Sequence, residues 1–340
     1  MRLLTPALAA LLAAHGTVKA LEIPPLPEAV TSFGAVIAGG KLYAYGGHMA
    51  GSHSWSLETT SGKLRAFDLQ NPGTWADLAE GPRVQSPAVA THEGKIYLIG
   101  GMQPQNEKGK DAVLKAQDHA MVFDPSTGKW TDLPRLPEPR SSHEAVVWGD
   151  KLYVVGGWPL NTGPDKKEQK PGDGAHRRSF HNVMLVLDLT RPDAGWQELP
   201  QPFERRAIAA VANAGRIYVL GGMDEKNEVS AQVDVYDIAA RTWSKAPDLP
   251  GGGRIKGFAT AACVLRGEVV ASPRGGKVFA LRGDSWVEVA KLGQSRFFHQ
   301  LEPWNDASVI ALGGTTGDEP VATAEVVAIP AAKTVGTVKP

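Results

Sequence analysis

Five arginines stand at turns that lead into short apolar segments, and they are the residues best suited to bind a ligand. A guanidinium group carries a planar fork of N–H donors that can hold a carboxylate through two parallel hydrogen bonds. If the five turns meet on one surface, they predict a site for a carboxylate or an acidic protein segment. The five residues are Arg83, Arg140, Arg205, Arg254 and Arg296.

Histidines accompany these arginines. His143 and His299 follow Arg140 and Arg296 at the same offset, and we predict that both take part in ligand binding. Imidazole nitrogens are also common metal ligands. No pair of histidines shows a tight ligand spacing, so we predict neither a metal nor another cofactor. The histidines expected on this surface are His48, His53, His143, His176, His181 and His299.

Two tryptophans offer a second binding chemistry. Trp55 and Trp158 lie outside the regular series of tryptophans described below. The flat face of an indole ring can stack on a sugar ring. These residues therefore favour a carbohydrate as the ligand, although loop tryptophans also pack into their own loops.

The composition limits the class of partner. Lys+Arg and Asp+Glu both total 36 among 340 residues, so the formal net charge is zero. A nucleic-acid-binding protein normally has a basic balance or a long basic stripe, and this chain has neither. Cys263 is the only cysteine, so no intramolecular disulfide can form. A single cysteine fits a protein of the bacterial periplasm or cell surface better than a disulfide-rich animal ectodomain.

The first twenty residues predict a secretory signal peptide. Arg2 precedes the apolar run "LLTPALAALLAA", and small residues end the segment at Ala20. This order of a basic start, an apolar run and a small-residue cleavage site is typical of export signals. No later stretch is apolar for the roughly 18 residues that a membrane span needs. We therefore expect a periplasmic or secreted protein without a membrane span.

One short phrase recurs through the rest of the chain. "KLYAYGGH", "GKIYLIGGM", "KLYVVGGW" and "RIYVLGGM" each contain a Gly-Gly pair, and a further pair falls at 313–314. The long gap before the last pair contains a hidden unit at 258–289, which makes six units. Each unit has four runs of strand character bounded by turn residues. A tryptophan opens the fourth run in five units, at Trp75, Trp130, Trp196, Trp243 and Trp286.

Sheets of this kind cannot bury their faces singly, but stacking them radially around an axis covers those faces. "GKIYLIGG" and "VFDPSTGKWTDLPRLPEPRSSHEAVV" resemble kelch motifs. The resemblance covers residues 21–329 and implies an all-β, six-bladed β-propeller. It leaves a structural role open for the arginines, because a Pro-Arg turn and a nearby His belong to the repeat itself.

The strand count predicts how the ring closes. The last unit ends with its third strand, "TAEVVAI" at 323–329, and "LEIPPLP" at 21–27 matches "TDLPRLP" at 131–137. We predict that the N-terminal strand completes the sixth blade, leaving 330–340 as a disordered tail. The loops after Gly-Gly are long in units one to three and short in units five and six. They predict an asymmetric mouth over the central pocket of a monomer.

Two enzyme classes can be compared with this pattern. Copper-radical oxidases built on kelch repeats need a Tyr and a Cys at the site, whereas the tyrosines here lie in strands. "LGQSRFFHQLEPWNDASVIALGG" (292–314) resembles the last blade of exported bacterial kelch proteins, including the N-acetylneuraminate epimerase (mutarotase) group. In that group a catalytic Glu follows the fourth Gly-Gly, with an Arg six residues on. Met223 and Val229 stand there, which leaves Asp224 and Glu225 as candidates for proton transfer.

The lead prediction is therefore an exported propeller that binds a carbohydrate, a sugar acid or an acidic protein partner at the mouth. A sialate mutarotase-like activity is the alternative.

Overall fold

The computed structural model describes residues 21–163, 180–251 and 256–332. The predicted signal peptide, most of the predicted tail, Arg254 and His176 lie outside these ranges. Among the described residues, the only helix is a short 3₁₀ turn, η1 (Pro192–Ala194), and no helix has the length and apolarity to cross a membrane.

Strands make up six principal sheets. The first contains β1 (Gly34–Ala38), β2 (Lys41–Tyr45), β3 (Lys63–Asp68) and β4 (Ala76–Glu80). The second contains β5 (Ala88–His92), β6 (Lys95–Ile99), β9 (Ala120–Asp124) and β10 (Lys129–Asp132). The third contains β11 (Ser141–Trp148), β12 (Lys151–Trp158), β13 (Val183–Asp188) and β14 (Gln197–Pro200).

The remaining sheets follow the same antiparallel order. The fourth contains β15 (Ala209–Asn213), β16 (Arg216–Leu220), β17 (Val233–Asp237) and β18 (Thr242–Ala246). The fifth contains β19 (Ala261–Leu265), β20 (Glu268–Ser272), β21 (Lys277–Arg282) and β22 (Ser285–Lys291). The sixth contains β23 (Gln300–Asn305), β24 (Ser308–Leu312) and β25 (Ala324–Ala328). A separate small ribbon pairs β7 (Met102–Pro104) with β8 (Leu114–Ala116).

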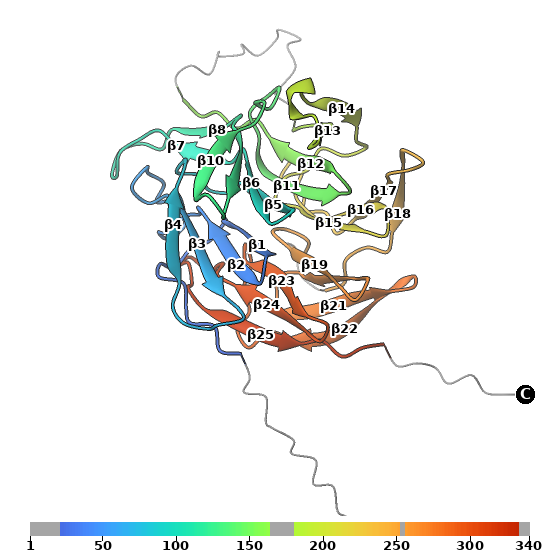
Figure 1. Cartoon of the computed structure of the whole chain (residues 1–340). Helices are drawn as coiled ribbons and strands as arrows, with labels where there is room; N and C mark the ends of the chain where they lie inside the picture. The colour runs from blue at the N-terminus through green and yellow to red at the C-terminus, as the bar shows by residue number, and fades with distance from the viewer. Residues whose placement is uncertain (1–20, 164–179, 252–255, 333–340) are drawn as a thin grey trace, which may run out of the picture.

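The six sheets are the blades of a closed ring. Their first strands, β1, β5, β11, β15, β19 and β23, lie around the centre, each contacts the next, and β23 contacts β1 (Figure 1). Apolar side chains of neighbouring blades pack together between the sheets, as Ala145 and Leu152 of blade 3 do against Ala90 and Ile99 of blade 2. The predicted six-bladed propeller is therefore confirmed, including the hidden fifth unit.

In four blades the repeated tryptophan bonds to the blade before it, whereas the Trp130 indole N–H has no partner among the described residues. The indole Nε1 of Trp196, in blade 3, donates to the carbonyl of Pro134 in blade 2 at 2.8 Å. This bond satisfies the one polar atom of a ring that is otherwise packed on apolar neighbours. The equivalent bonds are Trp75 to Pro24, Trp243 to Pro200, and Trp286 to Pro247.

The N-terminal segment lies where the strand count placed it. Trp75 donates to the Pro24 carbonyl at 2.9 Å, the Leu26 N–H donates to the Ala322 carbonyl at 2.8 Å, and Ile23 is buried beside them. Residues 21–26 nevertheless form no strand. The prolines at 24, 25 and 27 explain this difference, because proline has no N–H to give to a strand ladder. The sixth blade is closed by packing and single bonds.

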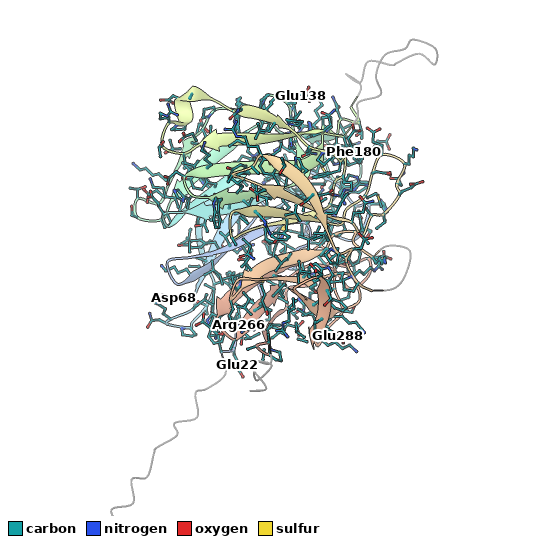
Figure 2. All side chains as sticks on the ribbon, turned by 90° about the vertical axis from the view of Figure 1, so that its right-hand side faces the viewer. Glu22, Asp68, Glu138, Phe180, Arg266 and Glu288 are labelled. Carbon is teal, nitrogen blue, oxygen red and sulfur yellow. The ribbon has the colours of Figure 1, made fainter. Side chains whose placement is uncertain are left out.

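The two faces of the ring differ. Because successive strands run in opposite directions, the loops between second and third strands share one face, here called the loop face. The tight turns between first and second strands share the other, here called the turn face. In the edge-on view of Figure 2, Phe180 of the loop face and Asp68 at the end of β3 lie toward opposite sides of the molecule.

Candidate functional site

Six residues, one from each blade, form a ring around the axis at the loop face. All have a left-handed backbone, with φ between 49° and 55°. Each N–H donates to the carbonyl of the equivalent residue in the preceding blade, at 2.6–3.3 Å, and the N–H of blade 1 closes the circle on blade 6. Left-handed non-glycine residues persist only where their surroundings hold them. The six members are Ser32, Ser86, Ser142, Ala207, Ala259 and Phe298.

This axial ring lines a small cavity of about 80 Å³. Blades 1 to 3 contribute serine hydroxyls to it, whereas blades 4 to 6 contribute Ala207, Ala259 and Phe298. The axial ring itself thus has a hydroxylic half and an apolar half, while Thr260, His299 and Gln300 add polar groups to the cavity in blades 5 and 6.

Arg206 lies in the apolar half, stacked between two aromatic rings. Its guanidinium carbon is 4.4 Å from the centre of the Trp158 ring and 5.7 Å from that of Phe258. Nη2 lies 3.3 Å from the sulfur of Met223, and Nε is buried without a hydrogen-bond partner. Arg206 makes no ion pair with any residue that the structure describes. Burial lowers its pKa, although a guanidinium stays charged at physiological pH.

The aromatic half continues around the mouth toward blade 6. Phe258 meets Phe298 edge-on at 5.2 Å, and Phe298 meets Phe297 at 5.3 Å. The guanidinium of the exposed Arg274 lies 4.3 Å above the Phe297 ring. We call Trp158, Arg206, Phe258, Phe297, Phe298 and Arg274 the mouth cluster.

The predicted arginines occupy a different environment from the one expected. Arg140, Arg205 and Arg296 are 1–4% exposed, so their side chains lie in the interior and not on a surface open to a ligand. Nη1 of Arg140 donates to the carbonyls of Gly156 and Val183, at 3.0 and 3.1 Å. The left-handed Gly-Gly turn directs the first of these carbonyls inward, where the guanidinium is the donor that satisfies it.

Arg205 and Arg296 repeat this arrangement in blades 4 and 6. Nη1 of Arg205 donates to the Gly221 and Gln232 carbonyls, and Nη1 of Arg296 donates to those of Gly313 and Thr323. Each also pairs with a carboxylate of its own blade, Asp234 and Glu325 respectively. These arginines hold the second and third strands of their blades together. Arg83 remains exposed, with Nη1 3.4 Å from the Leu57 carbonyl.

Four of the predicted histidines, His48, His143, His181 and His299, are also interior residues, whereas His53 is exposed. His143 and His299 are 2% and 3% exposed. Burial lowers the pKa of His143 well below its usual value and that of His299 to about 3, so both rings are neutral at physiological pH. His181 is buried as well, and its Nε2 lies 3.1 Å from the Pro139 carbonyl.

Metal ligation can be examined within the described residues. There, one group brings three ligand atoms within 4.8 Å of one another: His92, Glu93 and Asp150. These residues lie in turns of the turn face, away from the mouth. The histidines predicted for the loop face are not members of this group.

The two predicted tryptophans separate. Trp158 belongs to the mouth cluster, whereas Trp55 meets the His53 ring edge-on at 5.0 Å within the first long loop. The Trp55 carbonyl accepts a hydrogen bond from the Asn106 side chain at 2.7 Å. Trp55 therefore helps to join the first two long loops.

The two candidate proton-transfer residues brace the fourth loop. Oδ1 of Asp224 accepts the N–H groups of Lys226 and Glu228, both at 2.9 Å. Oε1 of Glu225 accepts the Phe180 N–H at 2.6 Å. Both carboxylates line an open acidic groove at the rim and do not belong to the mouth cluster.

Two further carboxyls line the inner strands. Glu144 in β11 and Glu302 in β23 have surroundings that raise the pKa of each to about 8, mainly through burial. The negative charge of Glu144 further raises the pKa of Glu302. Neither makes an ion pair among the described residues, so both are largely protonated at neutral pH.

Sequence reasoning missed Arg206, Phe258, Phe297 and Phe298. The signal was present in the doublet Arg205-Arg206, where only the first residue was chosen, and in the pair Phe297-Phe298 next to Arg296. Adjacent residues at a strand entry point in opposite directions. The partner of the chosen arginine was therefore the one at the mouth.

Comparisons with known proteins agree with this architecture. The family model described as "Kelch motif" matches residues 85–137 and 204–250. Beta-scruin of Limulus polyphemus is 28% identical over 231 residues, which are 66% of this chain and 22% of that protein. Kelch-like protein terF of Aspergillus terreus is 26% identical over 274 residues, covering 76% of this chain and 52% of the relative. The chain thus spans about half or less of these curated relatives.

A solved structure, titled "Structure of YjhT", is similar in fold. It superposes with a TM-score of 0.72 at 16% sequence identity, covering 92% of this chain and 98% of that one. At this identity the similarity speaks for the fold alone.

Proposed function

We propose that this six-bladed kelch-repeat propeller is an exported binding protein whose mouth takes a ligand that carries a carboxylate. The ligand would be a sugar acid or an acidic side chain of a partner protein. The observation that carries the proposal is Arg206, a guanidinium stacked on Trp158 and without a carboxylate partner among the described residues. The signal peptide predicted from the sequence of residues 1–20 favours a role outside the cytoplasm.

Stacking explains why Arg206 suits such a ligand. An aromatic ring above the guanidinium plane fixes its orientation and leaves the in-plane N–H groups directed sideways. A carboxylate arriving in that plane accepts two parallel hydrogen bonds. The serine hydroxyls of the axial ring lie across the mouth and can bind further oxygen atoms of the ligand.

A mutarotase-like activity on N-acetylneuraminate is the alternative, suggested by the resemblance of the last blade. The bonds of Asp224 and Glu225 to loop N–H groups weigh against it, because a proton-transfer group must reach the substrate. One-dimensional NMR of freshly dissolved N-acetylneuraminate separates the two. If the anomers equilibrate at the spontaneous rate with the protein present, the mutarotase-like activity is excluded and only the binding proposal remains.

The binding proposal is tested by calorimetric titration with N-acetylneuraminate, glucuronate and a Glu-rich peptide. Arg206→Ala should weaken binding about ten- to a hundredfold, since a hydrogen bond to a charged group contributes roughly 1.5–3 kcal/mol. Arg206→Lys should recover part of the affinity, because the charge remains but the fork is lost. Arg191→Ala, on the turn face and 77% exposed at its side chain, is the matched control. Equal affinity of parent and Arg206→Ala, or no binding of any probe, would refute the proposal.

A further inference from the structure

A second groove lies on the turn face, between blades 3 and 4. It has a volume of about 340 Å³, within the size range of small-molecule pockets. Its walls come from the β11–β12 turn, from β13 and β14, and from the end of β17. Because the turn face is opposite the loop face, this groove is separate from the mouth and its ligand.

Trp148 forms one wall of the groove and is unusually exposed. The residue is 40% exposed, and it is the only aromatic residue among the large exposed apolar residues of the described part of the chain. Unlike Trp196, it does not take part in the bonds between blades. The neighbouring turn of blade 4 carries Ala214 and Gly215, and a side chain added at Gly215 would only just reach the Trp148 ring. Part of the indole ring is therefore open to solvent beside a turn without bulky side chains.

Two tyrosines line the same groove with unused hydroxyls. Tyr153 and Tyr236 are 4% and 3% exposed, and neither hydroxyl makes a hydrogen bond with a described residue. By contrast, the hydroxyl of Tyr45 donates to the Pro82 carbonyl at 2.8 Å. Neither hydroxyl is among the buried polar atoms without a partner, so both reach solvent at the groove and are free to bond to a ligand. Burial also raises the pKa of both, which keeps them protonated and able to donate.

The positive and negative charges of the residues that line the groove are equal in number. Asp150 and Asp188 carry the negative charges and Lys151 and Arg241 the positive ones, which gives a formal net charge of zero. Asp150 is held by His92 Nε2 at 3.2 Å, and Asp188 accepts bonds from Thr190. A charged ligand gains nothing overall from such a lining. An uncharged ligand rich in hydroxyl groups can use both donors and acceptors.

We propose that this groove is a carbohydrate-binding site, in which a neutral pyranose ring stacks on Trp148 and its hydroxyls bond to Tyr153, Tyr236 and Gln197. A sugar ring has one relatively apolar face and an edge of hydroxyls. The groove offers the complement of each, a partly open indole ring and a set of unpaired polar groups. This assignment is independent of the carboxylate proposed for the mouth.

The test is NMR titration of protein labelled with ¹⁵N, using neutral trisaccharides of glucose, galactose, mannose and N-acetylglucosamine. Assignment of the Trp148 indole N–H signal comes from its loss in Trp148→Phe. At least one trisaccharide at millimolar concentration should shift this signal. Trp148→Ala should weaken its binding about tenfold or more, since an aromatic contact of this size contributes on the order of 1.5 kcal/mol.

Tyr236→Phe serves as the second variant, because it removes one hydroxyl and keeps the packing. It should weaken binding by a fewfold, while Arg206→Ala and Trp55→Ala, both on the loop face, should bind like the parent. Thermal melting of each variant excludes loss of folding as the cause. If no trisaccharide shifts the Trp148 signal, or if Trp148→Ala binds like the parent, the assignment is wrong. A shift that is lost in Arg206→Ala would place the sugar at the mouth and also overturn it.

Discussion

The interior of the blades and the mouth both use arginine, but in opposite ways. Arg205 is buried, donates to the Gly221 and Gln232 carbonyls and pairs with Asp234. Arg206, the next residue, stacks on Trp158 and has no carboxylate partner among the described residues. The first arginine has its hydrogen-bonding capacity used by the fold, and the second has it available. Hydrogen-bonding groups that are unused and held in a fixed orientation, and not the residue type alone, are what distinguish the proposed binding region.

The interior is expected to dominate stability, and the largest effect should come from its closing segment. Removal of residues 21–27 deletes the buried Ile23 and Leu26, the Leu26–Ala322 bond and the acceptor of Trp75. We expect a loss of about 5 kcal/mol or more and aggregation through the exposed edge of β25. Urea unfolding measures it. A truncated protein that unfolds at the parent's midpoint would show that blade 6 closes without this segment.

Arg205→Ala and Arg206→Ala form a matched pair that tests the comparison directly. Arg205→Ala should cost about 3–5 kcal/mol, because it removes the interior partner of the fully buried Asp234. Arg206→Ala should cost less than about 1 kcal/mol, since no bond to the protein's charged groups is lost. Urea unfolding gives the free energy of unfolding of each variant, and ligand titration gives its affinity. The comparison fails if the two variants lose stability equally.

Glu302 sharpens the comparison, because it is an interior acid without a cationic partner. The folded protein keeps its proton up to about pH 8, whereas the unfolded chain releases it near its ordinary pKa. The stability that protonated Glu302 provides is full below that ordinary value and is lost as pH rises toward 8. Glu302→Gln, which mimics the protonated form, should therefore exceed the parent at pH 9 by about 2 kcal/mol or more.

Unfolding curves at pH 5, 7 and 9 measure the effect, with the exposed Glu107→Gln as control. The advantage of Glu302→Gln should shrink toward pH 5. An advantage that is constant across the three pH values would contradict ionisation of the buried carboxyl as its cause.

The smallest predicted effect concerns the bonds between blades. Trp196→Phe keeps an aromatic ring and loses the bond to the Pro134 carbonyl, which should cost about 1 kcal/mol. Trp130→Phe is a suitable control, because its Nε1 has no partner among the described residues. A larger cost for Trp130→Phe than for Trp196→Phe would mean that ring packing, not the hydrogen bond, joins the blades.

Much of the fold could be predicted because it repeats. The Gly-Gly pairs, the strand runs and the regular tryptophans together indicated six units, and the unit around Ser272 was found although it lacks the Gly-Gly pair at that position. The closing segment was placed correctly, but its prolines made it an irregular segment instead of a strand. Residues that recur in every unit make the same contacts in every blade, and most of these contacts lie in the interior.

The candidate sites are the places where the blades differ, so the repeat could not reveal them. Arg140 and Arg296 were chosen for the mouth because they recur, and recurrence was the sign of their structural role. Whether an arginine meets a carbonyl or an open ring depends on residues distant in the chain, such as Gly156 for Arg140 and Trp158 for Arg206. Trp148 lies at a hairpin turn, and no pattern in the neighbouring residues predicts that its ring is exposed.

The axial ring has a consequence for how the molecule comes apart. Linear arrays of repeats fray from their terminal units, because those units have a neighbour on one side only. Here the circle of backbone bonds has no terminal member, since Ser32 bonds to Phe298 as Ser86 bonds to Ser32. Detaching any one unit breaks two links of the circle at once. The first and last units are thus as firmly fastened as the middle ones, and the chain should melt in one concerted step.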